Sequence, residues 1–258
     1  MTIKAFFRIF LALIVALPTA CGSSAQQVKT YGYKVEEALP HDISSYTQGL
    51  FFYDGRLYES AGQYGESNFR EVDLKTGRVL RRMNFETRYF AEGACVFDGR
   101  LYVLTWREKE CFVYDMKTWK QLGTLRYNGE GWGLTTDGKS LIMSDGTSTL
   151  TFRNPETFAV ERTVDVTLHG KKVIYLNELE YVKGEIWANV YGTDQIVRIN
   201  PETGVVTGVI NCKGLLPASL RKPRTDVLNG IAVDARGNIW LTGKYWPKMY
   251  RITLVEKK

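Results

Sequence analysis

A module of roughly 40 to 45 residues recurs from about Tyr46 to the end of the chain, which is the length typical of one propeller blade. The motif Asp-Gly-Arg-Leu-Tyr stands at 54–58 and 98–102, and looser versions follow at 137–141, 184–187 and 237–240. Asp-Gly and Gly-Asn supply the positive φ angles of tight hairpin turns, and the residues after them are typical of strands. Because one four-stranded sheet cannot bury both faces, radial packing of repeated sheets is the stable solution. The sequence therefore predicts an all-β fold, a five-bladed β-propeller.

A second turn motif follows the first in four of the five modules, at 73–77, 115–119, 154–158 and 200–204. Each begins with Asp or Asn, whose side chain can hydrogen-bond the backbone that follows it. These motifs predict the hairpins that join the two outer strands of a blade. The fifth module ends early, so we expect the strand-like segment 28–38 to supply its outermost strand. The alternative is that this segment is a disordered linker.

The first 21 residues have the composition of a secretory signal, with Lys4 and Arg8 ahead of an apolar stretch at 9–17. We predict a signal peptide at 1–21, a short linker at 22–27 and a single propeller domain at 28–258. Cys21, followed by Gly-Ser-Ser, is a candidate for lipidation, and simple cleavage near Ala20 or Ala25 is the alternative. Either way the protein is expected to be exported, as a periplasmic protein or a protein lipid-anchored at the bacterial cell envelope.

Charge and cysteine content exclude some classes of protein. The formal net charge is +6, and the basic residues are scattered, so binding to nucleic acid is not supported. Membrane contact is expected only through the lipid anchor, and a monomer is expected. Cys95 and Cys111 could form a disulfide in an oxidising compartment, or they could be buried free thiols. With two histidines in the chain and no metal-ligand spacing of cysteines, a His-rich zinc site is not supported.

Polar or aromatic side chains stand at the start of the innermost strand of every module, where the loops surround one mouth of the channel. We expect a ring formed by Gln48, Glu92, Trp132, Asn177 and Asn229. The alternative is that such amides only satisfy buried backbone groups and water. Glu92, between Phe90 and Gly93, is the most specific candidate, because desolvation would raise the pKa of its carboxyl and suit it to general acid/base catalysis.

Several ordered motifs resemble the plant and bacterial type of glutaminyl-peptide cyclotransferase, also called glutamine cyclotransferase. They are Tyr-Thr-Gln-Gly-Leu at 46–50, Phe-Ala-Glu-Gly at 90–93, Leu-Thr-Trp at 104–106, Glu-Gly-Trp-Gly-Leu at 130–134, Asn-Glu-Leu-Glu-Tyr at 177–181, Trp-Ala-Asn-Val at 187–190, Leu-Asn-Gly-Ile-Ala at 228–232 and Thr-Gly-Lys-x-Trp-Pro at 242–247. The resemblance implies a five-bladed propeller that converts the N-terminal glutamine of peptides and proteins to pyroglutamate with loss of ammonia.

The same resemblance assigns roles to residues at matching positions. Glu92 is the implied catalytic carboxylate, and Lys244 is implied either to stabilise the oxyanion or to anchor a substrate carbonyl. The implied substrate-binding residues are Tyr46, Gln48, Phe90, Trp106, Trp132 and Asn177. Tyr191 stands where plant members carry Trp, and we expect it to complete the aromatic pocket. No cofactor is expected to be required.

Two other functions fit a propeller. One is a non-catalytic propeller that binds a peptide or another ligand at the cell envelope, since one fold hosts many functions. The other is a metal-dependent hydrolase or lactonase, which would need several carboxylates converging on a calcium ion. Since Glu92 is the one clear carboxylate expected at the axis, any calcium ion in the central channel is expected to be structural.

Overall fold

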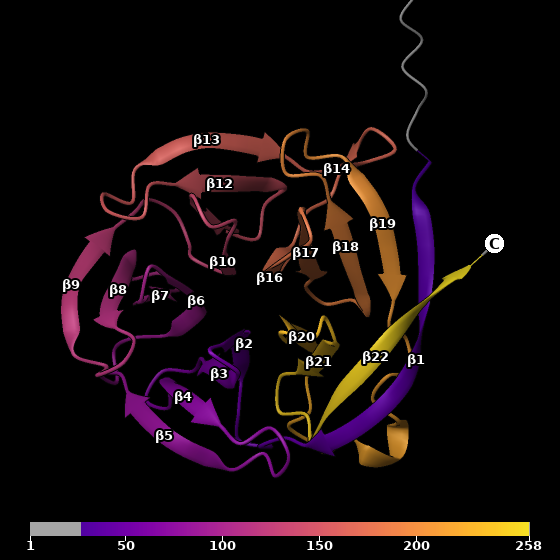
Figure 1. Ribbon diagram of the computed structural model, residues 1–258, viewed down its shortest axis with the longest axis horizontal. Coiled ribbons are helices and arrows are strands. Elements are labelled where there is room, and N and C mark those ends of the chain that lie inside the picture. Colours follow the sequence, from indigo (N-terminus) through magenta and orange to yellow (C-terminus); the bar gives the residue numbers. More distant parts are fainter. Residues whose placement is uncertain (1–26, 258) are drawn as a thin grey trace, which may run out of the picture.

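The computed structural model describes residues 27–257 as a ring of β-sheets (Figure 1). In this range the helical structure is the short 3-10 element η1 (Ala218–Leu220). None of the helices in residues 27–257 has the length and apolar character that crossing a membrane requires. The predicted signal peptide and the lipidation candidate Cys21 lie outside the described residues. The prediction of an all-β fold is confirmed.

Three antiparallel sheets have four strands each, and each runs in chain order from the centre of the ring to its rim (Figure 1). The first contains β2 (Thr47–Tyr53), β3 (Arg56–Ala61), β4 (Asn68–Val72) and β5 (Val79–Asn84). The second contains β6 (Ala91–Phe97), β7 (Arg100–Thr105), β8 (Glu110–Asp115) and β9 (Gln121–Arg126). The third contains β10 (Leu134–Thr136), β11 (Leu141–Met143), β12 (Thr149–Arg153) and β13 (Val160–Asp165).

The fourth sheet has eight strands in two halves. One half contains β16 (Leu176–Val182), β17 (Glu185–Val190), β18 (Gln195–Ile199) and β19 (Val206–Asn211). The other contains β20 (Leu228–Val233), β21 (Ile239–Gly243), β22 (Lys248–Lys257) and β1 (Lys29–Pro40). A short parallel pairing of β1 with β19 joins the halves. The strands β14 (Thr167–Leu168) and β15 (Lys171–Lys172) form a separate two-stranded sheet, which a bridge between Thr167 and Val205 connects to the residues before β19.

The innermost strands form a closed cycle around the centre. β2 contacts β6, β6 contacts β10, β10 contacts β16, β16 contacts β20, and β20 contacts β2. Apolar side chains fill the spaces between neighbouring sheets, as where Phe69 of the first sheet packs with Leu101 and Phe112 of the second. Burial of apolar area stabilises a fold by about 25 cal/mol per Å². The stability of this propeller-like ring therefore comes from contacts between sheets.

Both predicted turn motifs have the expected conformations. Asp54 and Gly55 have φ angles of 48° and 71°, as a tight hairpin requires. Asp73 Oδ1 accepts hydrogen bonds from the backbone N–H of Thr76 at 2.8 Å and from its hydroxyl at 2.6 Å. Asp115 and Thr118 repeat the same pair of bonds in the second sheet. The turn residues therefore fix the registers with which neighbouring strands pair.

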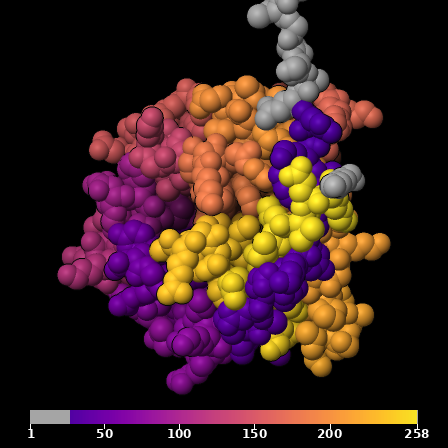
Figure 2. Space-filling model, turned by 45° about the vertical axis from the view of Figure 1, so that its right-hand side comes forward, coloured from indigo at the N-terminus to yellow at the C-terminus, as the bar shows by residue number. Residues whose placement is uncertain are grey.

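The N-terminal strand completes the sheet that ends early. β1 pairs antiparallel with β22, from Thr30 opposite Lys257 to Pro40 opposite Lys248. Figure 2 shows the indigo segment lying beside the yellow one on this face of the molecule. The prediction that segment 28–38 forms the missing outer strand is confirmed, and the linker alternative is wrong. The last strand, β22, extends to Lys257 and so gives β1 a long pairing partner.

Gly133 marks a point where two inner strands approach too closely for any side chain. A Cβ at this position would lie 1.9 Å from the carbonyl oxygen of Asn177, which is backbone and cannot rotate away. We expect Gly133→Ala to lower the free energy of unfolding by at least about 3 kcal/mol, since overpacking of this kind forces the backbone to shift. Urea denaturation measures the change. Gly123→Ala is the matched control, because a Cβ there meets no atom within 4 Å, and equal loss in both variants would contradict this account.

Candidate active site

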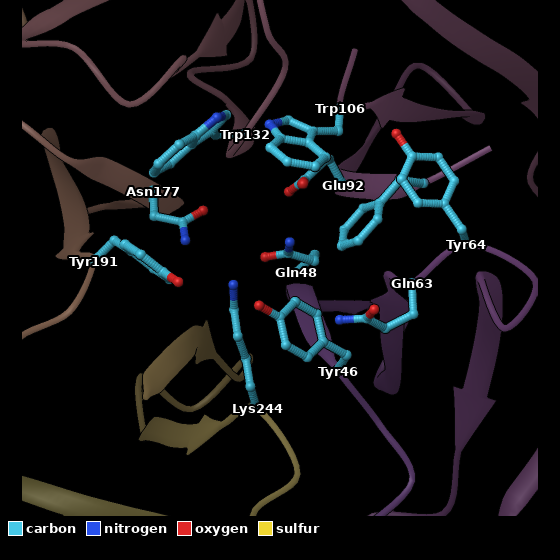
Figure 3. A pocket seen from close by; sticks show the side chains of 11 residues that line it. Tyr46, Gln48, Gln63, Tyr64, Glu92, Trp106, Trp132, Asn177, Tyr191 and Lys244 are labelled. Carbon is cyan, nitrogen blue, oxygen red and sulfur yellow. The ribbon is translucent and has the colours of Figure 1, made fainter. Parts of the chain in front are cut away.

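A cavity of about 420 Å³ lies at the end of the ring where the inner strands begin. Its volume is in the range of about 300–1,000 Å³ that small-molecule sites occupy. Figure 3 shows its side chains, with the polar ends of Gln48, Glu92, Asn177 and Lys244 directed toward the middle. The nine residues predicted for catalysis and substrate binding all line it, namely Tyr46, Gln48, Phe90, Glu92, Trp106, Trp132, Asn177, Tyr191 and Lys244.

Irregularities in three inner strands place the three central polar groups. The register shifts between Thr47 and Gly49 in β2, between Ala91 and Ala94 in β6, and between Leu176 and Leu179 in β16. Bulges change the direction of a side chain and are common next to active sites. Gln48, Glu92 and Asn177 stand within these irregularities, so their side chains enter the cavity instead of the spaces between sheets.

A second set of lining residues directly follows the second strand of a sheet. Each of these residues donates its backbone N–H to a carbonyl oxygen just before the first strand of its sheet. The pairs are Trp106 with Phe90, Tyr191 with Tyr175, and Lys244 with Val227. In the first sheet the corresponding residue is Gly62, whose N–H donates to Tyr46. A Cβ on Gly62 would lie 2.3 Å from the ring of Phe90. The Phe90 ring therefore occupies the space that a side chain at position 62 would need.

Aromatic rings form the wall of the cavity. The ring centroids of Phe90 and Trp106 are 5.4 Å apart, and those of Trp132 and Tyr191 are 5.6 Å apart. Glu130 fixes both indoles, because its Oε2 accepts from Nε1 of Trp106 at 2.7 Å and from Nε1 of Trp132 at 3.0 Å. Partial burial opposes the charge on Glu130, but these bonds hold the pKa of its carboxyl below the usual range. Glu130 thus positions two rings that would otherwise rotate.

Glu92 and Lys244 are two opposite charges that share the cavity without a direct ion pair in the described structure. Their exposed fractions are only 4% and 2%. Desolvation raises the pKa of Glu92 well above its usual value, although Lys244 opposes the shift. Desolvation lowers the pKa of Lys244 to about 8, although Glu92 opposes that shift. Nζ of Lys244 lies 4.4 Å from the ring centroid of Tyr46 and 4.9 Å from that of Tyr191, which favours the ammonium form.

Asn229 is not part of the cavity wall, so the predicted ring of five is wrong at this position. Its Nδ2 donates to the carbonyl oxygen of Thr47 at 2.9 Å and to Oε1 of Gln48 at 3.3 Å. Asn229 therefore lies behind Gln48 and orients it. With Oε1 accepting from Asn229, Gln48 presents its NH₂ group to the cavity. The Oδ1 atoms of Asn177 and Asn229 are both buried with no hydrogen-bond partner in the described structure, and of these two residues Asn177 lines the cavity.

The sequence suggested that Glu92 is the one clear carboxylate at the axis, and this expectation is wrong. Glu178 is buried, and its carboxylate accepts from the backbone N–H of Leu50 at 3.2 Å and of Ile231 at 2.8 Å. These bonds join the inner strands of three different parts of the ring. Glu178 does not line the cavity, so its role is to hold these inner strands together. Within residues 27–257, no group of three or more His, Cys, Asp or Glu side chains could hold a metal ion.

A buried polar network supports the two chain segments that carry Tyr46 and Lys244. Glu59 Oε1 accepts from the hydroxyls of Ser45 and Thr47 at 2.5 and 2.6 Å, and it contacts Nε2 of His41 at 3.1 Å. Nδ1 of His41 contacts the carbonyl oxygen of Trp246 at 2.7 Å. Since both partners of the imidazole are acceptors, both of its nitrogens must carry a proton. The resulting imidazolium links the loop before β2 to the loop after β21.

The structure decides whether Cys95 and Cys111 form a disulfide or are buried free thiols. Cys95, Cys111 and Cys212 are free and buried, so no disulfide joins Cys95 to Cys111. Burial raises the pKa of each of these thiols, which makes them unreactive at neutral pH.

Two lining residues, Gln63 and Tyr64, were not predicted. They follow Gly62, and neither belongs to a motif that repeats between modules. A signal was present in the sequence, because the predicted residues Trp106, Tyr191 and Lys244 each directly follow the second strand of a module.

Comparison with known proteins identifies the family of this chain. The model of the glutamine cyclotransferase family matches residues 9–254. The chain belongs to the glutamine cyclotransferase family. This confirms the resemblance that the motifs indicated. A glutaminyl-peptide cyclotransferase of Arabidopsis thaliana is 42% identical over 228 residues, which are 86% of this chain and 71% of that protein.

A solved structure of a related protein has the same fold. The crystal structure of the glutaminyl cyclase of Myxococcus xanthus superimposes with a TM-score of 0.84 at 35% identity. The match covers 90% of this chain and 100% of that chain. This member of the glutamine cyclotransferase family therefore shares its architecture with a glutaminyl cyclase over nearly its whole length.

Proposed function

We propose that this protein is a glutaminyl-peptide cyclotransferase that converts the N-terminal glutamine of peptides and proteins to pyroglutamate and releases ammonia. The reaction is an acyl transfer within one residue, from the side-chain nitrogen to the α-nitrogen. The observation that carries the proposal is a buried carboxylate, Glu92, facing a buried ammonium, Lys244, across an aromatic cavity in a member of this family.

Glu92 is assigned both proton transfers. Its carboxylate takes a proton from the substrate α-ammonium, and the free amine then attacks the side-chain amide carbon. The proton passes from Glu92 to the nitrogen that departs. Collapse of the oxyanion breaks the old C–N bond and releases ammonia. Glu92 then takes the extra proton from the ring nitrogen and transfers it to the ammonia, which leaves as ammonium. A carboxyl whose pKa is raised by desolvation suits this exchange.

The oxyanion is assigned to Lys244, with the NH₂ group of Gln48 as a second donor. Preorganised donors in a water-excluded site stabilise such charge strongly. Asn177 Oδ1, which has no partner in the described structure, is assigned to accept a hydrogen bond from the substrate. Because the reaction is intramolecular, the aromatic wall contributes by holding glutamine in a folded, near-attack shape. No cofactor is needed for these steps.

The experiment is incubation of purified, chelator-dialysed protein with a peptide that begins with glutamine, with ammonia release and peptide mass measured over time. We expect release of one ammonia for each peptide and the matching loss of mass. Activity that returns only when calcium is added would support a calcium ion in the channel. A peptide that binds without losing mass would favour the non-catalytic binding propeller.

We also infer that the ring has five blades. The eight-stranded sheet then counts as two blades, β16 to β19 and β20 to β22 with β1. The closed cycle of five inner strands supports this count.

We further propose that the protein acts outside the cytoplasm as a monomer, in the periplasm or anchored through Cys21. The basic and apolar composition of residues 1–21 supports export.

A further inference from the structure

The backbone of Gln63 has a conformation that side chains rarely adopt. Its φ angle is 106°, whereas the other non-glycine residues with positive φ in the described chain lie between 47° and 64°. Those values fall in or near the left-handed region at about +50° to +70°, where asparagine, aspartate and others are tolerated. Gln63 lies outside that region. Glycine would fit this conformation without strain.

Hydrogen bonds on both sides hold Gln63 in this conformation. The carbonyl oxygen of Gln63 accepts from the backbone N–H of Glu66 at 3.0 Å and from the hydroxyl of Ser67 at 2.8 Å. The backbone N–H of Gly62 donates to the backbone carbonyl oxygen of Tyr46 at 2.9 Å. Strain that the surroundings maintain in this way is concentrated at functional sites.

The strained backbone directs the Gln63 amide into the cavity. Figure 3 shows this amide next to Tyr46, on the side opposite Asn177 and Tyr191. No residue in the described structure forms a hydrogen bond with its side chain. Tyr64 is next to it, with its ring 5.3 Å from that of Phe90 and its hydroxyl donating to Glu108 at 2.9 Å. Gln63 thus offers a free donor and a free acceptor beside a fixed aromatic ring.

Burial separates these two residues from the reacting centre. Gln48, Glu92, Asn177 and Lys244 are buried, whereas Gln63 is half-buried and Tyr64 is 49% exposed. A substrate whose α-amine reaches Glu92 must direct its following residues toward solvent. The side of the cavity formed by Gln63 and Tyr64 leads outward from the buried centre.

We propose that the side-chain amide of Gln63 recognises the backbone carbonyl oxygen of the second residue of a peptide substrate, with Tyr64 forming the adjacent wall. The site is then built for peptides and proteins in preference to single amino acids. This inference rests on the proposed cyclase activity and names a residue that selects peptides among the substrates of that activity. Gln63 is a specificity residue, since the reacting atoms lie at Glu92.

The test compares two substrates, L-glutaminamide, which ends before a second residue, and the dipeptide amide Gln-Ala-NH₂. We expect Gln63→Leu, which keeps the side-chain bulk but removes the amide, to lower kcat/KM for the dipeptide amide about tenfold through KM, the effect of roughly one net hydrogen bond. Turnover of glutaminamide should stay within about twofold of the wild type, since that substrate has the amide nitrogen of a second residue but lacks the carbonyl oxygen that Gln63 contacts.

Gln63→Gly is the control for folding. It should show the same loss for the dipeptide amide while its melting temperature is equal to or higher than that of the wild type, because glycine relieves the strain. An equal loss for both substrates, or no loss for either, would overturn the inference while leaving the cyclase activity established. Failure of the wild type to cyclise either substrate would overturn the proposed function first, before any variant is compared.

Discussion

Glu92→Gln is expected to lower the rate of ammonia release by a factor of about 10² to 10⁴, the range that general acid/base catalysis contributes. The glutamine side chain keeps the shape of the carboxylate but cannot exchange a proton with the α-amine or with the departing nitrogen. Single-turnover assays with a peptide that begins with glutamine measure the loss, and calorimetry should show that the peptide still binds.

The same variant should be at least as stable as the wild type. Burial disfavours the charged form of Glu92, so the folded protein carries a cost at any pH above the ordinary pKa of this group, and a neutral amide removes it. Glu178→Gln is the matched control, since Glu178 is buried near the same axis but does not line the cavity. Glu178 differs from Glu92 in that each of its two carboxyl oxygens accepts a backbone N–H, whereas an amide has one acceptor oxygen. Glu178→Gln should therefore lower the melting temperature and leave turnover of the folded protein near normal. A wild-type rate in Glu92→Gln would refute the assignment.

Lys244→Met is expected to lower kcat by a factor of about 10² to 10³, as removal of an oxyanion donor does in other enzymes. The folded-state pKa of Lys244, about 8, lies below its usual 10.5. Burial of the ammonium therefore costs stability below about pH 8, and this cost declines as pH rises toward 10.5. Lys244→Met should consequently melt at a higher temperature than the wild type at pH 7.

The pH dependence of kcat separates Lys244 from the substrate. Ionisation of the substrate amine makes the rate rise with pH, whereas loss of the Lys244 proton should make it fall above about pH 8. In Lys244→Arg the guanidinium stays charged, so the fall near pH 8 should disappear even if the rate is lower throughout. A fall that persists unchanged in Lys244→Arg would show that another group causes it.

Repeats in the sequence predicted the ring, and they placed Gln48, Glu92 and Asn177 at corresponding points. They could not predict that Asn229, which occupies the corresponding point in its strand, lies outside the cavity wall. Register shifts occur at all four positions, and Asn229 lies instead against the backbone of Thr47 and the side chain of Gln48. Whether a side chain enters the cavity or supports a neighbour depends on contacts between strands that are distant in sequence.

Gln63 is a lining residue that the repeats did not predict. Trp106, Tyr191 and Lys244 directly follow a second strand, and the corresponding residue of the first sheet is a glycine. Only the three-dimensional structure shows that the Phe90 ring fills that space and that the lining residue is displaced by one position along the chain. The contribution of Glu178 was missed for a similar reason, because its hydrogen-bond partners are strands far away in sequence.

The pairing of β1 with β22 has a consequence for biosynthesis. Lys29 and Glu256, which form an ion pair across this seam, are 227 positions apart in the chain. The strand β1 must therefore wait for β22 before the antiparallel hydrogen bonds between them can form, and in the meantime this edge of β1 is unpaired. Contacts between the two ends of a chain form slowly, because the entropy of closing so large a loop is lost before the pairing stabilises the product. The first three sheets can each form from local hairpins as they are translated. The cavity cannot take its final shape until the whole chain is available, since Lys244 comes from the sheet that β1 completes.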